Sequence, residues 1–475
     1  MDKNEQEVLK EETSNRKEIH KDNKREEEVE DREEQRSCIV LVGKHGLRET
    51  GNAATLYRLR DHVISGSYTC VLIDPGDVNK NDPASEVISI REQYKISAIV
   101  GIHLYRSSSV LLKCKELDIP VICYFGGTDV NENIRDPQKL NTMTKVAAAA
   151  TYLIAFNGDM KRRALSLWPF LKDDTIKILP QAVTVEPDQG FECYSWIRES
   201  EKSFYSTVAT TSCVNNENED DTPKGNKSHP FHAVADIEYQ NLENQRKWLF
   251  DGRPKKNDLS FAEVEKCPSC SSIFNLNAKN RRLPLPEEYN PLVVLVAGLR
   301  PVKDVMYVAD AWSEWQGRQG KGKMIIIGPT LDDDYTRNAM AHARRLNGII
   351  ITDKLSPTAC QAVIFNATVV INTSLSEGMS AAILEAMALG KPVLARNIPG
   401  NAAIIKHGVN GLLFNTPEDF VKELEHLQQN PELVETMTTN LLNYLHSNHC
   451  PEMEKKSLLQ ILRDTETIAT NRKAM

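Results

Sequence analysis

Twelve short apolar segments, separated by longer segments of helical length, limit the fold of this chain more than any other feature. They form two series of six, at 38–43, 70–74, 96–103, 119–125, 152–156 and 176–180, and then at 292–298, 324–329, 348–352, 367–373, 392–397 and 411–414. Near-continuous apolar runs of this length are typical of parallel strands covered by helices on both faces. The sequence therefore predicts an α/β fold with two doubly wound, Rossmann-like sheets.

The same pattern divides the chain into five parts. The first 36 residues include 23 charged ones and no sustained apolar period, which favours a disordered tail. The stretch 188–287 is polar and too long for an ordinary connection, so we expect an interdomain insertion without regular elements. Between and after these stretches we expect a first domain at 37–187, a second at 288–450, and a C-terminal helix at 451–475 that crosses back to the first domain.

Composition excludes several classes of protein. The net charge of -8 argues against a nucleic-acid-binding protein, whose binding domain is usually basic. No run of about 18 apolar residues occurs, so we expect no integral membrane segment. The charged N-terminus lacks the apolar core of a secretory signal, and Cys38, Cys70 and Cys123 lie within apolar runs. We therefore expect a cytoplasmic protein.

The segment 376–392 carries the clearest chemical signal. Its composition predicts a helix from Met379 to Leu389, so Glu377 lies at the helix entrance and Glu385 follows eight residues later. Eight helical residues rise about 12 Å and place both carboxylates on a similar side, while free amides at the helix start suit a diphosphate. From spacing alone, a first-turn acid and a solvated helix acid explain the pair equally well. The apolar neighbours of Glu385 favour a ligand, because a buried carboxylate needs a hydrogen-bonding partner.

The motif SEGMSAAILEAM, followed by ALGKPV and GNAAIIKHGVNGLLF, resembles the retaining glycosyltransferases of family four. TGNAATLYRLR, HLYRSSS, FGGTDVNE and GLRPVKD add to the resemblance, which covers about 37–187 and 288–465. It implies the GT-B fold, in which two Rossmann-like domains face a cleft. It also implies transfer of a sugar from a nucleotide-diphosphate sugar, with no cofactor and no essential metal.

The resemblance also assigns roles to residues of the second domain. It places Glu377 at the donor sugar as the catalytic carboxylate and Glu385 at the ribose of the nucleotide. The remaining donor-binding residues that it implies are Gly378, Met379 and Ser380 through their backbone, and Arg300 and Lys303 as cations for the diphosphate. Fixed cations suit an anionic leaving group. The Arg-to-Lys spacing is shorter than is usual in the family, so the assignment of Lys303 rests on a better match than that of Arg300.

In the first domain, the resemblance implicates Gly51 and Asn52 at a helix start, in contact with the donor phosphates or the acceptor. Many family members carry a histidine where this chain has Gly126. His103, at the end of the run 96–103, is a candidate replacement, although a strand-end histidine is more often structural. Thr128 and Asp129 follow Gly126 and are candidate acceptor contacts, with Asp129 a second candidate catalytic residue.

The sequence thus predicts a retaining glycosyltransferase whose acceptor, a small molecule, a glycan or a protein, is unknown. Two alternatives remain open. One is a catalytically weakened binding or regulatory protein, which Gly126 favours, and the other is a nucleotide-sugar epimerase or hydrolase on the same fold. Two pairs of residues with metal-ligand chemistry, His229 with His232 and Cys267 with Cys270, are spaced too irregularly to predict a zinc site.

Overall fold

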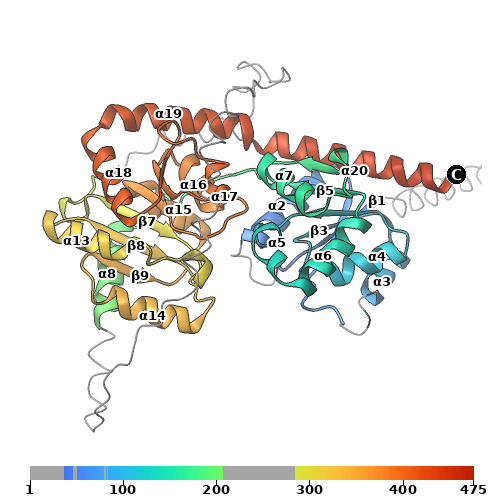
Figure 1. The fold of residues 1–475 in the computed structure, drawn as a ribbon, viewed down its shortest axis with the longest axis horizontal. Coiled ribbons are helices and arrows are strands. Elements are labelled where there is room, and N and C mark those ends of the chain that lie inside the picture. Colours follow the sequence, from blue (N-terminus) through green and yellow to red (C-terminus); the bar gives the residue numbers. More distant parts are fainter. Residues whose placement is uncertain (1–36, 46–50, 80–81, 83, 207–283, 475) are drawn as a thin grey trace, which may run out of the picture.

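The computed structural model describes residues 37–45, 51–79, 82, 84–206 and 284–474. The expected tail at 1–36, most of the stretch 188–287 and both His/Cys pairs lie outside these residues. Two bodies, each built on one sheet, lie side by side (Figure 1).

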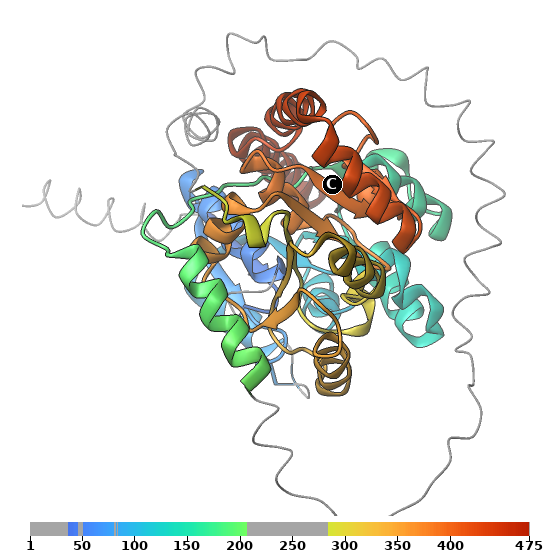
Figure 2. The ribbon, with the colours of Figure 1, turned by 90° about the vertical axis from the view of Figure 1, so that its left-hand side faces the viewer.

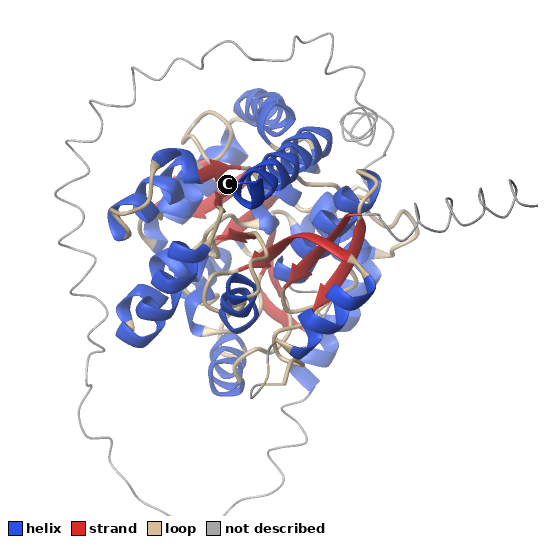
Figure 3. Cartoon of the chain, turned by 90° about the vertical axis from the view of Figure 1, so that its right-hand side faces the viewer, coloured by secondary structure: helices blue, strands red, loops and turns tan. Residues whose placement is uncertain are grey.

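The first body is a six-stranded parallel sheet with strand order β2-β1-β3-β4-β5-β6. Its strands are β1 (Ser37–Val42), β2 (Thr69–Ile73), β3 (Lys95–Ile102), β4 (Val121–Tyr124), β5 (Tyr152–Ala155) and β6 (Ile176–Ile178). Its helices are α2 (Gly51–Ser65), α3 (Ser85–Gln93), α4 (Ser108–Glu116), α5 (Gly127–Asn131), α6 (Pro137–Ala149) and α7 (Gly158–Leu167), with short 3₁₀ turns η1 (Asn133–Arg135) and η2 (Asp173–Thr175). Figure 3 shows these strands between helices on both faces.

The second body repeats this plan, with strand order β12-β11-β10-β7-β8-β9, again all parallel. Its strands are β7 (Leu292–Val296), β8 (Lys323–Ile327), β9 (Ile349–Thr352), β10 (Val369–Asn372), β11 (Val393–Arg396) and β12 (Leu412–Phe414). Its helices are α13 (Ala309–Gln319), α14 (Asp333–Ala343), α15 (Pro357–Asn366), α16 (Ala381–Ala388), α17 (Pro399–Ala402), α18 (Pro417–Gln429) and α19 (Pro431–Asn448), with η3 (Glu287–Tyr289) and η4 (Pro301–Lys303).

These two sheets confirm the predicted fold class. Most of the strands are buried along most of their length, as in β1, where five of six residues are inaccessible to solvent, whereas β2 and β6 at the two edges of the first sheet are more exposed. Val, Ile and Leu suit such strands because both faces pack against helices. The buried residues form two separate cores, one for each sheet, and Met379 packs against both. Met379 therefore marks where the two bodies meet.

Helix α8 (Cys193–Ser206) differs from the expectation of an irregular, interdomain stretch at 188–287. Its buried residues Cys193, Ile197 and Phe204 lie on one face and join the core of the second body. Tyr205 Oη donates to the carbonyl of Ile349 at 3.1 Å, which joins α8 to the edge strand β9. In Figure 2, α8 is the green helix on the outside of the molecule. Tyr289 also lies in this core, so both described ends of the insertion belong to the second body. The helical spacing of Cys193, Ile197 and Phe204 could have predicted α8 from the sequence.

Helix α20 (Pro451–Ala474) packs on the first body, although it follows the second in the chain (Figure 1). Leu458, Ile461 and Leu462 join the first core. One turn from its start, the buried Glu454 lies 2.7 Å from Arg58 Nε and 3.0 Å from His62 Nε2, both on α2. No helix within the described ranges is long and apolar enough to cross a membrane.

The chain passes between the bodies twice, and the two passes are bonded to each other. His449 Nδ1 lies 2.6 Å from the carbonyl oxygen of Gln181, and Val183 N–H donates to the carbonyl of His449 at 3.3 Å. His449 is buried, and burial lowers the pKa of its imidazole. A neutral imidazole keeps one N–H donor, which suits the single carbonyl acceptor at Nδ1.

We expect Glu454→Gln to lower the free energy of unfolding by about 3 kcal/mol, because it leaves the largely buried guanidinium of Arg58 without its carboxylate. Burial opposes ionisation of Glu454, but His62 and Arg58 hold its pKa below the ordinary value. The wild type therefore holds this stabilisation above about pH 4 and loses it as the pH falls through the lowered pKa. Denaturant titration at pH 7 and at acid pH measures both effects. Glu452→Gln, at an exposed position of the same helix turn, is the control and should change little.

Candidate active site

The candidate site lies at the carboxyl ends of β7 and β10, which are neighbours in the second sheet. Ligands of open α/β sheets usually bind beyond this edge. The chain after β7 enters η4, which carries Lys303, and the chain after β10 forms the loop 373–380, which carries Glu377. Leu375 N–H donates to the carbonyl of Val302 at 2.9 Å, and Thr373 Oγ1 donates to that of Lys303 at 3.0 Å. These bonds fix the two loops against each other.

Glu377 is held by one of its two carboxylate oxygens. Oε1 accepts from Lys303 Nζ at 2.6 Å, from Ser374 Oγ at 2.7 Å and from Asn372 Nδ2 at 3.1 Å. Burial alone would raise the pKa of Glu377, but the Lys303 ammonium and these three donors hold it below its ordinary value. Within the described chain no hydrogen bond is made to Oε2, so this oxygen is available to a ligand.

The structure therefore brings Glu377 and Lys303 together, and Arg300 lies at the entrance to the same turn, η4. Arg300 Nε is buried and has no hydrogen-bond partner among the described residues. A buried guanidinium N–H without a partner is costly, and an anionic ligand would satisfy it.

The loop Gly378–Ser380 leads into α16, which begins at Ala381, two residues later than predicted. Ser380 has an extended backbone and its Oγ accepts from Asn372 Nδ2 at 3.2 Å, so its hydroxyl does not cap the helix. The first amides of a helix have no internal partners, and a ligand anion can satisfy them. The helix ends at Ala388, one residue before the predicted Leu389, and Gly390 follows in the left-handed region at φ 66°.

Glu385 lies in the second turn of α16, and burial raises its pKa to about 7. No hydrogen bond to its carboxylate is formed by the residues that the structure describes. A half-buried carboxylate of this kind is well suited to accept hydroxyl groups of a ligand.

His103 directly follows β3 with a left-handed backbone, at φ 79°, and is buried. Nδ1 lies 2.7 Å from Asp129 Oδ1, and Nε2 lies 2.5 Å from Thr128 Oγ1. A Cβ atom on Gly126 would come within 2.3 Å of His103 Cδ2, so the ring occupies the space beside this glycine. The imidazole thus stands where a side chain at position 126 would begin.

Asp129 is completely buried, so in this conformation its carboxylate faces the protein rather than an acceptor. It accepts the N–H groups of Leu104 at 2.7 Å and Gly126 at 2.8 Å, besides its contact with His103. Thr128 is partly exposed and is the polar side chain of this group that remains nearest to solvent.

The first body touches the glutamate loop directly. Gly127 and Gly378 face each other so closely that a Cβ on Gly127 would lie 2.4 Å from Gly378 N. Asn131 Nδ2 donates to the carbonyl of Glu377 at 3.4 Å, and Asn157 Nδ2 donates to that of Gly378 at 3.5 Å. The cleft is therefore closed at this point by backbone contact between the two bodies.

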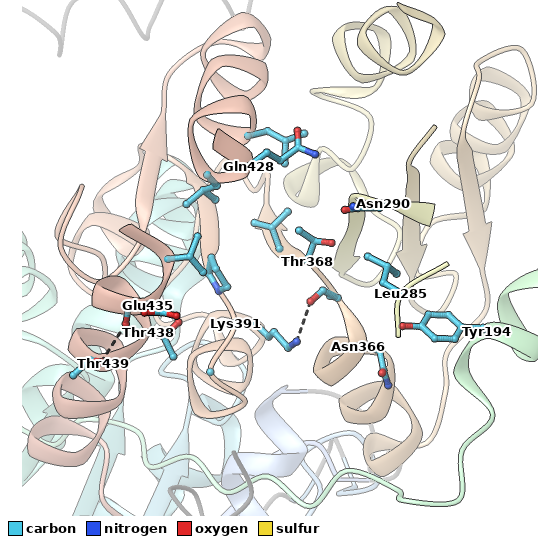
Figure 4. A pocket seen from close by; sticks show the side chains of 17 residues that line it. Tyr194, Leu285, Asn290, Asn366, Thr368, Lys391, Gln428, Glu435, Thr438 and Thr439 are labelled. Atoms are coloured by element: carbon cyan, nitrogen blue, oxygen red, sulfur yellow. Dashed lines mark hydrogen bonds between the residues drawn. The ribbon is translucent and has the colours of Figure 1, made fainter. Parts of the chain in front are cut away.

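Gly51 and Asn52 are the first residues of α2, and the surroundings of both residues lie outside what the structure describes. A cavity of about 590 Å³ lies elsewhere, at the amino ends of β10 and β11, beside Tyr194, Asn366 and Lys391 (Figure 4). Lys391 Nζ donates there to the carbonyl of Ala367 at 3.0 Å. This cavity is at the opposite edge of the sheet from Glu377. In the described ranges, no three His, Cys, Asp or Glu residues are grouped to hold a metal ion.

Sequence reasoning missed the asparagines that surround Glu377. Asn372 ends a buried apolar strand, where a polar side chain needs a partner, and this was a usable signal. Asn131 and Asn157 gave no such signal, because their role depends on how the two bodies meet.

Comparisons with known proteins agree with this architecture. The model of the family Glycosyl transferases group 1 matches residues 277–442. Glycosyltransferase 1 domain-containing protein 1 of Xenopus tropicalis is 31% identical over 406 residues, which cover 86% of this chain and 92% of that protein. Alpha-monoglucosyldiacylglycerol synthase of Acholeplasma laidlawii is 27% identical over 150 residues, covering 31% of this chain and 37% of that protein.

Solved structures share the fold at low sequence identity. Anabaena HepE in complex with UDP and glucose has a TM-score of 0.57 at 13% identity, covering 90% of this chain and 99% of that one. Sucrose-phosphate synthase from Thermosynechococcus elongatus has a TM-score of 0.59 at 12% identity, with the same two coverages. Two Rossmann-like bodies that meet at a glutamate loop place the chain in the GT-B class. The chain belongs to the group 1 glycosyltransferases.

We expect Gly127→Ala to separate the two bodies at the glutamate loop, because the new methyl group would collide with the backbone of Gly378. Hydrogen exchange at the amides of 377–380 should become faster, while the melting temperature stays close to that of the wild type. Gly158→Ala is the matched control, since its Cβ would approach nothing closer than 3.6 Å. Unchanged exchange in Gly127→Ala would contradict the contact.

Proposed function

We propose that this protein transfers a glycosyl group from a nucleotide-diphosphate sugar to an acceptor with retention of configuration, without a metal ion. The observation that carries the proposal is the state of Glu377, which is ionised, fixed through Oε1 and open at Oε2. A carboxylate oxygen so placed can accept a sugar hydroxyl and stabilise positive charge that develops at the anomeric carbon.

The donor would lie along the start of α16. Glu385 would accept the ribose hydroxyls, and the diphosphate would lie over the first amides of α16, between Arg300 and Lys303. Gly378, Met379 and Ser380 would contact the sugar through their backbone. The structure of HepE with UDP and glucose supports UDP-sugars as the first donors to test.

The chemistry requires charge stabilisation more than bond-making by the protein. The bond between the anomeric carbon and the diphosphate oxygen breaks, and a bond to an acceptor oxygen forms on the same face. The acceptor proton passes to the departing phosphate oxygen. Lys303 and Arg300 would stabilise the negative charge on that leaving group.

The pair His103 and Asp129 would serve as positioning residues in this scheme. Asp129 fixes the imidazole, and the imidazole fixes Thr128 at the rim of the cleft. This arrangement supports a contact of Thr128 with donor or acceptor. It also supports His103 as a substitute for the histidine that many family members carry at the position of Gly126. Gly51 and Asn52, at the start of α2, would face the donor phosphates or the acceptor.

The proposal is tested by incubating the purified protein with a panel of UDP-, GDP- and ADP-sugars and measuring the released nucleotide. Glu377→Gln should reduce release at least 100-fold, because it removes the charge at Oε2 without a change of shape. Glu418→Gln, at an exposed position of the same body, is the control and should stay within twofold of the wild type.

Two outcomes would redirect the proposal. Donor binding with no release under any condition would favour a binding or regulatory protein. Conversion of the donor to an epimer, or release that depends only on water, would favour the epimerase or hydrolase alternative. Binding that is unaffected by Glu377→Ala combined with Lys303→Ala would contradict the donor site itself.

We also expect UDP binding to strengthen as the pH rises from 6 to 8. Glu385 has a pKa of about 7, and its ionised form is the better acceptor for ribose hydroxyls, so the protonated form must first lose its proton. The dissociation constant should fall by up to about tenfold per pH unit below 7 and level off above it. Calorimetry measures this slope. Glu385→Gln should abolish the part of it that does not arise from UDP itself.

A further inference from the structure

A second layer of buried amides lies behind Glu377. Asn372 and Asn401 are 7% and 0% exposed, and neither was expected to be part of the site. Asn401 follows β11, in the short helix α17, and Asn372 ends β10. Asn401 Nδ2 donates to Asn372 Oδ1 at 3.0 Å, and Asn372 Nδ2 donates to Glu377 Oε1 at 3.1 Å.

The direction of this chain of hydrogen bonds is fixed by backbone groups at two points. Asn401 Nδ2 also donates to the carbonyl of Arg396 at 3.0 Å, and a carbonyl can only accept. Asn372 Oδ1 also accepts the N–H of Ser374 at 3.2 Å, and an N–H can only donate. Neither amide can rotate by 180° without placing like groups against each other. The NH₂ group of Asn372 must therefore face Glu377.

The geometry points to Asn401 and Asn372 as a positioning relay that holds the carboxylate of Glu377 in its productive orientation. This inference rests on the function proposed above for Glu377. The relay has a consequence for the site, because Oε1 receives a donor from Lys303, Ser374 and Asn372, which leaves Oε2 as the oxygen presented to a ligand. Buried hydrogen-bond networks of this kind act as a unit, so loss of the Asn401 amide should change the orientation of the Glu377 carboxylate.

Asn401→Asp tests the relay with little change of shape. It removes the NH₂ donor and sets an oxygen against Asn372 Oδ1, so Asn372 must turn away from Glu377. We expect the kcat for nucleotide release from the donor to fall at least tenfold, while the Kd for UDP, which carries no sugar to contact Glu377, stays within threefold. Asn397→Asp is the control, since Asn397 is exposed just before α17 and its side-chain amide donates to Asn415 Oδ1, away from Asn372 and Glu377. It should keep full activity.

A double variant separates positioning from general damage. If Asn401 acts through Glu377, Asn401→Asp should cause no further loss in the Glu377→Gln background. Losses that multiply would overturn the relay, and so would Asn401→Asp with the kcat of the wild type. If the wild type releases no nucleotide from any donor, the proposed function fails first, and the relay is then judged by a measurement that needs no turnover.

That measurement uses protein labelled with ¹⁵N at asparagine. Comparison of the wild type with Glu377→Gln should show shifted side-chain amide signals for both Asn372 and Asn401, although Asn401 makes no hydrogen bond to residue 377. The signals of Asn366 and Asn397 should not move. An unshifted Asn401 signal would overturn the relay whatever the activity of the protein.

Discussion

The ion pair between Lys303 and Glu377 joins the parts of this structure that matter for its chemistry. The two residues lie 74 positions apart, and they meet because parallel strands place the loops after β7 and β10 at one edge of the sheet. The pair is partly buried, and such a pair offsets its desolvation only when further hydrogen bonds complete it. Ser374, Asn372 and, behind them, Asn401 supply those bonds. The carboxylate of Glu377 is therefore held in place by groups of the protein itself.

The second body holds this group of residues, and the first body completes it. Gly127 and Gly378 are both glycines where the bodies touch, since either Cβ would collide with the opposite backbone. The amides of Asn131 and Asn157 then reach the carbonyls of the glutamate loop. Contact between the bodies thus acts on the backbone that a donor sugar would touch, which connects closure of the cleft to the geometry of the site.

Much of the fold was predictable because the strands are recognisable from the sequence alone. Continuous Val, Ile and Leu runs at regular spacing define all twelve strands without any tertiary information. Helix α8 was missed because its apolar spacing is short and surrounded by polar sequence. Glu377 and Glu385 were proposed from the local spacing of one segment, and Lys303 from the family resemblance. By contrast, two features depend on distances between separate strands. One is the position of the His103 ring beside Gly126, and the other is the relay through Asn401. The positive φ of His103 has no signature in the sequence.

The two chain passes between the bodies, joined by the bonds of His449 with Gln181 and Val183, have a mechanical consequence. A single tether would allow the bodies to twist and slide, whereas two tethers bonded side by side leave mainly rotation about one line. Relative motion of the two bodies would then be a hinge rotation about the two connections. Because two joined connections allow few relative orientations of the two bodies, the contact between Gly127 and Gly378 costs less orientational entropy than it would with a single connection.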